Sequence, residues 1–253
     1  MIGKIRRPRR GLLAIGVALA FVAAGCGGST STPGLPGGVT LPTIPGGGAV
    51  GTGSLSQGIA ANLDTLNSYK FTETMSGSSF GAQATSDSSG TTISGTVINK
   101  PDQREWINFA GSQFIVIGTQ EWMSSDGTTW MSAGAAVSAF DAYLPGKLYG
   151  TWFDAYSTGY QAAGEETQNG VACIHYKGNS SLGNMYSAIA GVNGTFTADL
   201  WVAKDGGYPV KGVLAITASA GGQGGSFGYT LDVTNVNDAT NAVAQPSVDA
   251  IPT

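Results

Sequence analysis

The chain has 253 residues, of which 42% are hydrophobic and 11% charged, and its formal net charge at pH 7 is −4. Five of its twelve basic residues, but none of its sixteen acidic residues, lie in the first 25 positions, so the remaining chain carries a net charge of −9. Such an acidic chain has no basic surface for nucleic acid or for anionic lipid headgroups, and we exclude nucleic acid as a partner.

Residues 1–25 have the features of an export signal. A basic segment is followed by an apolar run over residues 11–22, too short to span a bilayer, and the run leads through Ala-Ala-Gly to Cys26. Small residues directly before a cysteine are typical of a bacterial lipobox. We expect residues 1–25 to be removed and Cys26 to carry lipid, which would hold the protein on the extracytoplasmic face of the cell membrane. The alternatives are an uncleaved anchor and a secretory signal with a chance cysteine.

The segment 26–53 is predicted to be the lipidated cysteine and a tether. It is rich in Gly, Pro, Ser and Thr and contains no charged residue, so it cannot bury enough apolar surface to fold. The remaining residues, 54–253, are enough for one domain with a sizeable core.

This domain is predicted to begin with an amphipathic helix over residues 54–68. Apolar residues recur at helical spacing from Leu55 to Leu66, and Ser54 or Ser56 could cap the start. Alternating polarity or short apolar runs between turn residues then predict six strands. These strands cover residues 69–76, 91–99, 103–109, 113–117, 121–124 and 128–131.

The middle section has a different pattern. Residues 135–163 are rich in aromatic and aliphatic side chains and are interrupted by Pro145-Gly146, which predicts two short helices. Hairpin turns are predicted at Asp126-Gly127 and Asn169-Gly170, and a turn at residues 205–207, because glycine takes the positive φ that tight turns need. The later strands are predicted over residues 164–167, 171–177, 195–204, 209–219 and 227–236, with a short helix over 182–190.

Ten or so antiparallel strands with a few inserted helices make an α+β domain in which the sheet dominates. Several strands are apolar on both faces, such as residues 115–117 and 200–202, so both faces of the sheet must be covered. The helices can cover one face. The other face either closes on itself as a small barrel core or faces an apolar ligand.

Two hairpin phrases carry a resemblance to a known family. The first is Ile-Gly-Thr-Gln-Glu-Trp at residues 117–122 followed by Asp-Gly-Thr-Thr-Trp at 126–130. The second is Leu-Trp-Val-Ala-Lys-Asp-Gly-Gly-Tyr-Pro-Val-Lys at 200–211. Both resemble hairpins of the LolA-like lipid and lipoprotein carriers and of related actinobacterial lipoproteins of the LppX and LprG type. The order of segments is similar too, and the resemblance covers nearly all of residues 54–246.

The resemblance implies a curved antiparallel sheet, an incomplete β-barrel, with a few helices packed on or into it. Its concave apolar face would hold the acyl chains of a lipid or lipoprotein, and we expect that face to be free of charge. The resemblance also leaves room for a transport partner in the envelope. Ordinary core packing is the alternative role for the residues predicted to line the face. These are Trp106, Phe114, Val116, Trp130, Phe153, Leu200, Leu214 and Ile216.

We find no catalytic constellation in the sequence. His175, the only histidine, lies two residues from Cys173, and side chains at this spacing on a strand rarely converge on one hydrogen bond. Cys173 is expected to be a buried core residue without a disulfide partner. The adjacent pair Glu165-Glu166 is expected to be solvated at a strand start. The acidic residues lack metal-ligand spacing, so neither a metal nor another cofactor is expected.

The sequence therefore predicts a non-enzymatic, membrane-anchored lipoprotein that binds an acyl lipid or lipoprotein in an apolar cavity and could transfer it across the envelope. The alternative is a surface adhesion or scaffold module whose sheet binds protein or glycan. A carrier needs an internal void on the order of several hundred Å³, whereas a scaffold would be packed throughout.

Overall fold

A computed structural model of the chain describes residues 55–56, 58–78, 90–134, 144–147, 154–179, 184, 193–220 and 223–247. All of them belong to Ile44–Thr253, the second of two units into which the chain divides. The strands are β1 (Ser68–Ser78), β2 (Thr91–Ile98), β3 (Arg104–Phe109), β4 (Ser112–Ile117), β5 (Gln120–Ser124), β6 (Met131–Gly134), β7 (Tyr160–Gln168), β8 (Val171–Gly178), β9 (Asn193–Ala203), β10 (Pro209–Ala220) and β11 (Gln223–Thr234). Two short 3₁₀ helices are η1 (Ile59–Thr65) and η3 (Asp154–Gly159).

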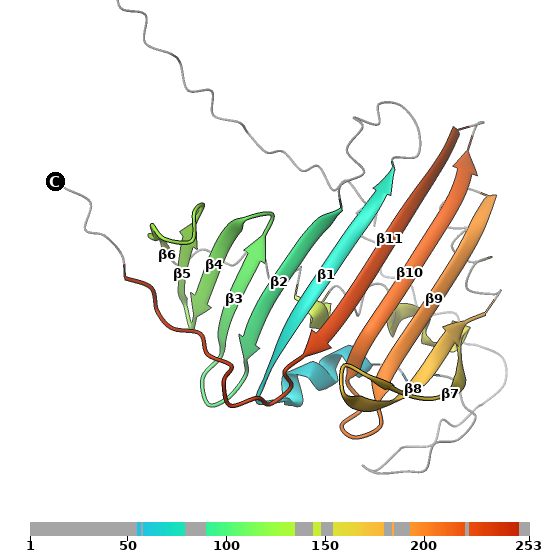
Figure 1. Ribbon diagram of the computed structural model, residues 1–253, viewed down its shortest axis with the longest axis horizontal. Helices are drawn as coiled ribbons and strands as arrows, with labels where there is room; N and C mark the ends of the chain where they lie inside the picture. The colour runs from blue at the N-terminus through green and yellow to red at the C-terminus, as the bar shows by residue number, and fades with distance from the viewer. Residues whose placement is uncertain are drawn as a thin grey trace, which may run out of the picture. The chain divides into compact units, whose positions relative to one another are not determined.

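The strands form one antiparallel sheet in the order β6-β5-β4-β3-β2-β1-β11-β10-β9-β8-β7 (Figure 1). Within each half of the chain, successive strands are neighbours in the sheet, so the sheet consists of two meanders. They are joined where β1 pairs with β11, from Lys70 opposite Thr234 to Ser78 opposite Ser226. Among the described residues β6 and β7 are the two ends of this order, so the sheet is open and does not close into a barrel.

The opening helix is shorter than predicted. It spans Ile59–Thr65, and the residue before it is Gly58 with φ of 78° and no side-chain cap. The predicted cap by Ser54 or Ser56 is therefore wrong, because a left-handed residue at position 58 cannot continue a right-handed helix toward the N-terminus. The apolar spacing does identify the packed side of η1, since Leu63 is fully buried.

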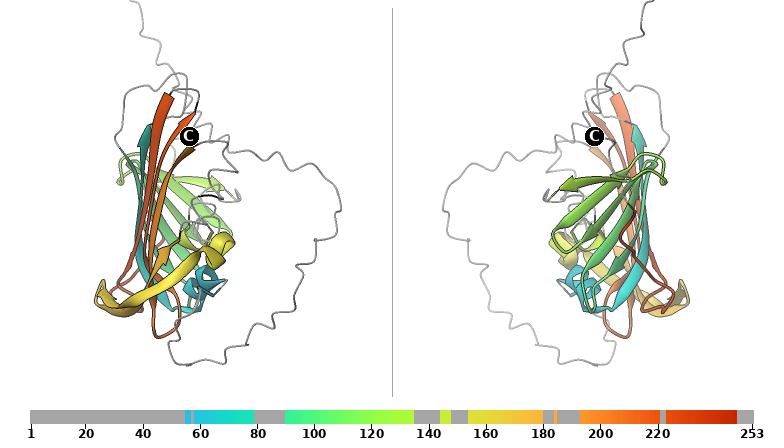
Figure 2. Two further views of the ribbon diagram at one scale, coloured as in Figure 1. Left: turned by 90° about the vertical axis from the view of Figure 1, so that its right-hand side faces the viewer. Right: turned by 90° about the vertical axis from the view of Figure 1, so that its left-hand side faces the viewer.

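The sheet is curved, and η1 lies on its concave side (Figure 2). Side chains of η1 and of the concave face form the larger of two buried clusters. Directly opposite residues of an antiparallel pair lie on the same face of the sheet. The pairing register therefore shows which side chains of each strand lie on the concave face. The cluster includes Ile59, Leu63, Tyr69, Phe71, Ile93, Val97, Ile107, Phe114, Leu200, Leu214, Leu231 and Val233.

The convex face carries a second, smaller cluster over β2–β5. Ile115, Trp122 and Val243 are its buried members. Val243 belongs to the segment that follows β11, and its carbonyl accepts a hydrogen bond of 3.3 Å from Arg104 Nη1. Partly buried residues complete the cluster, namely Ile98, Trp106, Ile117 and Trp130. Strand β4 is thus covered on both faces, as its continuous apolar sequence predicts.

The predicted hairpin at Asn169-Gly170 is confirmed. Both residues have positive φ, 50° and 79°, and the flanking Gln168 and Val171 are paired, so the loop has two residues. The turn before β10 likewise has positive φ at Gly206 and Gly207.

The turn that begins at Asp126-Gly127 is longer than predicted. Asp126 Oδ1 accepts hydrogen bonds from the backbone N–H groups of Thr128 (2.8 Å) and Thr129 (2.7 Å). These bonds hold the pKa of the Asp126 carboxyl well below its usual range. Because the carboxylate takes these two donors, residues 128 and 129 belong to the turn and β6 begins only at Met131.

The middle section is described in part. Within residues 135–163 there are a helical turn at 145–147, η3 and the start of β7 at Tyr160, earlier than predicted. The rest of the two predicted helices, the helix over 182–190 apart from residue 184, Phe153 and Cys26 lie outside the described residues. No helix in the described part of the chain has the length and apolarity needed to cross a membrane.

Candidate ligand-binding site

A pocket of about 510 Å³ lies on the concave face, between η1, strands β1–β3 and the helical turn near residue 146. Its floor is a cross-strand row, because Tyr69 is opposite Val97 and Val97 is opposite Glu105. Its walls are formed by Ala60, Ala61, Asp64, Asn99, Gln103, Leu144, Gly146 and Lys147. A volume of this size is within the range of small-molecule sites, roughly 300–1,000 Å³.

Side-chain hydrogen bonds fix η1 above this floor. Asn99 Nδ2 donates to the carbonyls of Leu63 (2.9 Å) and Leu66 (3.1 Å). At the other side of η1, Asn62 Nδ2 donates to the carbonyl of Gly207 at 2.9 Å. The carbonyl of Leu63 also accepts from the backbone N–H of Leu66 at 3.3 Å, so Asn99 adds to the bonding at the helix end. The walls of the pocket are therefore held in place by the protein itself.

The floor of the pocket carries a carboxyl group that is shielded from solvent. Glu105 is 3% exposed, and its Oε1 accepts a hydrogen bond of 2.9 Å from Gln103 Nε2. Burial raises the pKa of the neighbouring Tyr69, and the negative charges of Asp64, Glu105 and Glu73 raise it further.

A further carboxyl group is buried elsewhere on the same face. Glu73 is fully buried, and Tyr229 Oη donates to its Oε1 at 2.9 Å. Burial raises the pKa of Glu73 to about 8, against the smaller opposing effect of the Tyr229 hydrogen bond. Glu73 is therefore mainly protonated and uncharged at neutral pH.

Contrary to the expectation of a charge-free concave face, this face contains acidic side chains. Three glutamates, Glu73, Glu105 and Glu121, are buried on it. Glu105 and Glu121 flank Val116 in adjacent strands. Each of these glutamates stands at a strand position where the alternation predicts an apolar side chain. Glu73, for example, follows Phe71 by two residues. That spacing is the signal by which they could have been found in the sequence.

Five of the residues predicted to line the concave face do lie on it, namely Phe114, Val116, Leu200, Leu214 and Ile216. None of them lines the pocket. Trp106 and Trp130 belong to the cluster on the convex face, which corrects their predicted position. Trp106 lies between Glu105 and Ile107, and successive side chains of a strand point to opposite faces. Contact of any of these residues with a ligand stays a prediction.

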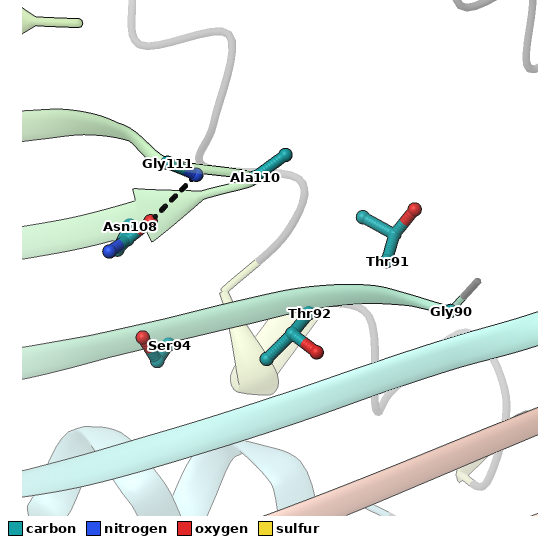
Figure 3. A pocket seen from close by; sticks show the side chains of 7 residues that line it. All are labelled: Gly90, Thr91, Thr92, Ser94, Asn108, Ala110 and Gly111. Carbon is teal, nitrogen blue, oxygen red and sulfur yellow. Dashed lines mark hydrogen bonds between the residues drawn. The ribbon is translucent and has the colours of Figure 1, made fainter. Parts of the chain in front are cut away.

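A second hollow of about 500 Å³ lies at one end of β2 (Figure 3). It is lined by Gly90, Thr91, Thr92, Ser94, Asn108, Ala110 and Gly111. As Figure 3 shows, Asn108 Oδ1 accepts a hydrogen bond of 3.1 Å from the backbone N–H of Gly111, which closes the turn between β3 and β4. The lining contains neither a charged nor an aromatic side chain, and we assign no ligand to it.

On the convex face, the ring of His175 is held between carboxylates of the two neighbouring strands. Nδ1 lies 2.9 Å from Glu166 Oε1, and Nε2 lies 2.7 Å from Asp199 Oδ1. The ring stacks on Trp201 with 4.4 Å between centroids, and Trp201 Nε1 donates to Glu166 Oε2 at 2.8 Å. Both ring nitrogens are therefore engaged with carboxylates that tie β7, β8 and β9 together.

The contacts of Cys173 differ from those of His175. It is fully buried, as predicted, and its Sγ lies 3.3 Å from the Val171 carbonyl. Burial raises the pKa of the thiol. Glu165 and Glu166 lie inside β7 and not at its start, and Glu165 pairs with Lys204 at 2.8 Å. Among the residues that the structure describes, no group of three His, Cys, Asp or Glu residues is placed to hold a metal ion.

No protein-family model and no curated protein matches the chain. Among solved structures, it is similar to the lipoprotein LppX of Mycobacterium tuberculosis, with 18% identity and a TM-score of 0.34 over 72% of this chain and 97% of that chain. It is also similar to a LolA superfamily protein of Nitrosomonas europaea, with 10% identity and a TM-score of 0.25 over 79% and 96% of the two chains.

A third similar structure is that of MucB of Pseudomonas aeruginosa with MucA, with 15% identity and a TM-score of 0.30 over 69% of this chain. The chain spans about half of the length of that protein, 54%.

Proposed function

We propose that this chain is a non-enzymatic, lipid-anchored protein of the bacterial envelope that binds an acyl-bearing ligand on the concave face of its sheet. The observation that carries the proposal is the 510 Å³ pocket between η1 and β1–β3. Ala60, Val97 and Leu144 give it apolar walls, and polar side chains occupy the rest of the lining. This combination suits an amphiphile, because each buried methylene contributes about 0.8 kcal/mol while the polar groups fix orientation.

The second candidate is a scaffold module, which the packing of the other half of the face favours. Leu200, Leu214 and Leu231 on β9–β11 are at most 1% exposed, so this region is filled by the protein's own side chains. The pocket lies apart from this packed region. The two candidates therefore differ in whether the pocket is occupied.

Filling the pocket with Ala61→Trp is expected to reduce bound lipid at least tenfold. Ala61 is an exposed residue of η1 that lines the pocket, so a larger side chain occupies the ligand's space without entering the core. The full-length protein would be purified in detergent from the membranes of a bacterial host. Native mass spectrometry and organic extraction then measure the non-covalently bound lipid.

The matched control is Thr65→Trp, which places the same side chain at an exposed position of η1 outside the pocket. It is expected to keep the bound lipid of the unsubstituted protein. Equal lipid in Ala61→Trp and Thr65→Trp, or no lipid in any sample, would overturn the proposed site and favour the scaffold.

A further inference from the structure

The polar lining of the pocket contains both acidic and basic side chains. Two carboxylates, those of Asp64 and Glu105, face one ammonium group, that of Lys147. Lys100, which follows β2, is not part of the lining and donates from Nζ to the carbonyl of Thr65 at 2.7 Å. The lining therefore holds two acidic side chains and one basic side chain.

The acidic group on the floor is buried, whereas the basic group of the lining is exposed. Glu105 is 3% exposed, whereas Lys147 is an exposed residue at the rim. The charge of an exposed group is screened by water, while a buried charge acts through a lower effective dielectric constant. The amide of Gln103 donates a hydrogen bond to Glu105 but brings no positive charge.

We propose that the pocket binds an acyl ligand by a cationic, amine-bearing polar end, with the ammonium group meeting the carboxylates of Asp64 and Glu105. This inference rests on the proposed function, because it concerns the ligand of the same pocket. A ligand ammonium would form charge-assisted hydrogen bonds, which are about twice as strong as neutral ones. A phosphate or carboxylate at the same place would be repelled by Glu105, and its desolvation would not be compensated.

Three amphiphiles with the same chain and different ends test this inference: dodecylamine, dodecan-1-ol and dodecanoic acid. The binding of each to the full-length protein would be measured by calorimetry at neutral pH. We expect the amine to bind about tenfold or more tightly than the acid, with the alcohol between them. Glu105→Gln, which keeps an oxygen to accept from Gln103, is expected to lower the affinity for the amine about tenfold and to leave the alcohol unchanged.

Asp64→Asn is a second variant that does not touch the buried floor, and it is expected to weaken amine binding in the same direction. Glu165→Gln on β7, a glutamate outside the pocket, is the control and should leave all three affinities unchanged. If none of the three compounds binds, the proposed function fails. If all bind equally, or the acid binds best, the pocket binds acyl chains but the inference of an amine is overturned.

Discussion

Replacing Glu73 with glutamine is expected to raise the free energy of unfolding at pH 7 by about 3 kcal/mol. The pKa of Glu73 is raised from 4.5 to about 8 in the folded protein. Between these values the folded state holds a proton that the unfolded chain releases. The folded state therefore binds more protons, and its stability falls as pH rises, by about 1.4 kcal/mol per pH unit.

Glutamine does not titrate, so the stability of the variant does not fall with rising pH in this way. It keeps an oxygen that can accept from Tyr229, and at pH 4 both proteins have an uncharged side chain at position 73. Urea unfolding at pH 4, 6, 7 and 8.5 should thus show two curves that meet at low pH and separate up to about pH 8. Glu165→Gln, at an exposed position, should follow the unsubstituted protein. Parallel curves for Glu73→Gln and the unsubstituted protein would show that Glu73 is not buried as described.

Gly95→Ala is expected to lower the free energy of unfolding by about 2–3 kcal/mol, although alanine normally stabilises a strand relative to glycine. A Cβ atom at position 95 would lie 2.5 Å from Cε1 of Phe71 and 2.6 Å from the carbonyl oxygen of Trp106. Phe71 is itself 2% exposed in the core, so its ring has no free space into which to move. Urea or thermal unfolding measures the loss.

The matched control is Gly224→Ala on β11, where the nearest atom to the added Cβ is the carbonyl oxygen of Ala218 at 3.9 Å. That substitution should be neutral or slightly stabilising. Combining Gly95→Ala with Phe71→Leu should recover part of the lost stability, because the smaller side chain leaves room for the methyl group. Equal effects of the two single glycine substitutions would contradict the contact between Phe71 and Gly95.

The positions of the strands could be predicted from the sequence, because alternation and turn residues are local signals. Asn169-Gly170 specifies its hairpin within two residues. The opening helix was harder to delimit, since one left-handed residue, Gly58, decides where it begins. The shift of β6 to Met131 depends on which backbone N–H groups Asp126 accepts from, and composition does not reveal this.

The candidate site could be predicted only in part, because it depends on which strands become neighbours. Alternation places Trp106 and Glu105 on opposite faces, but it does not say which of them faces η1. Glu105 enters the pocket because it is opposite Val97, which in turn is opposite Tyr69. In the same way, the contacts of His175 come from Glu166 and Asp199 on two other strands, so no local sequence pattern joins them.

The pairing of β1 with β11 leaves an edge of β1 uncovered while the chain is being synthesised. Ser78 meets Ser226, so this pairing cannot form until nearly all of the chain has been synthesised. Until then one edge of β1 presents unpaired N–H and C=O groups, and such an edge is a template for pairing with another chain. A nascent or C-terminally truncated chain is therefore exposed to aggregation along β1, and the last strand completes the sheet by covering its first.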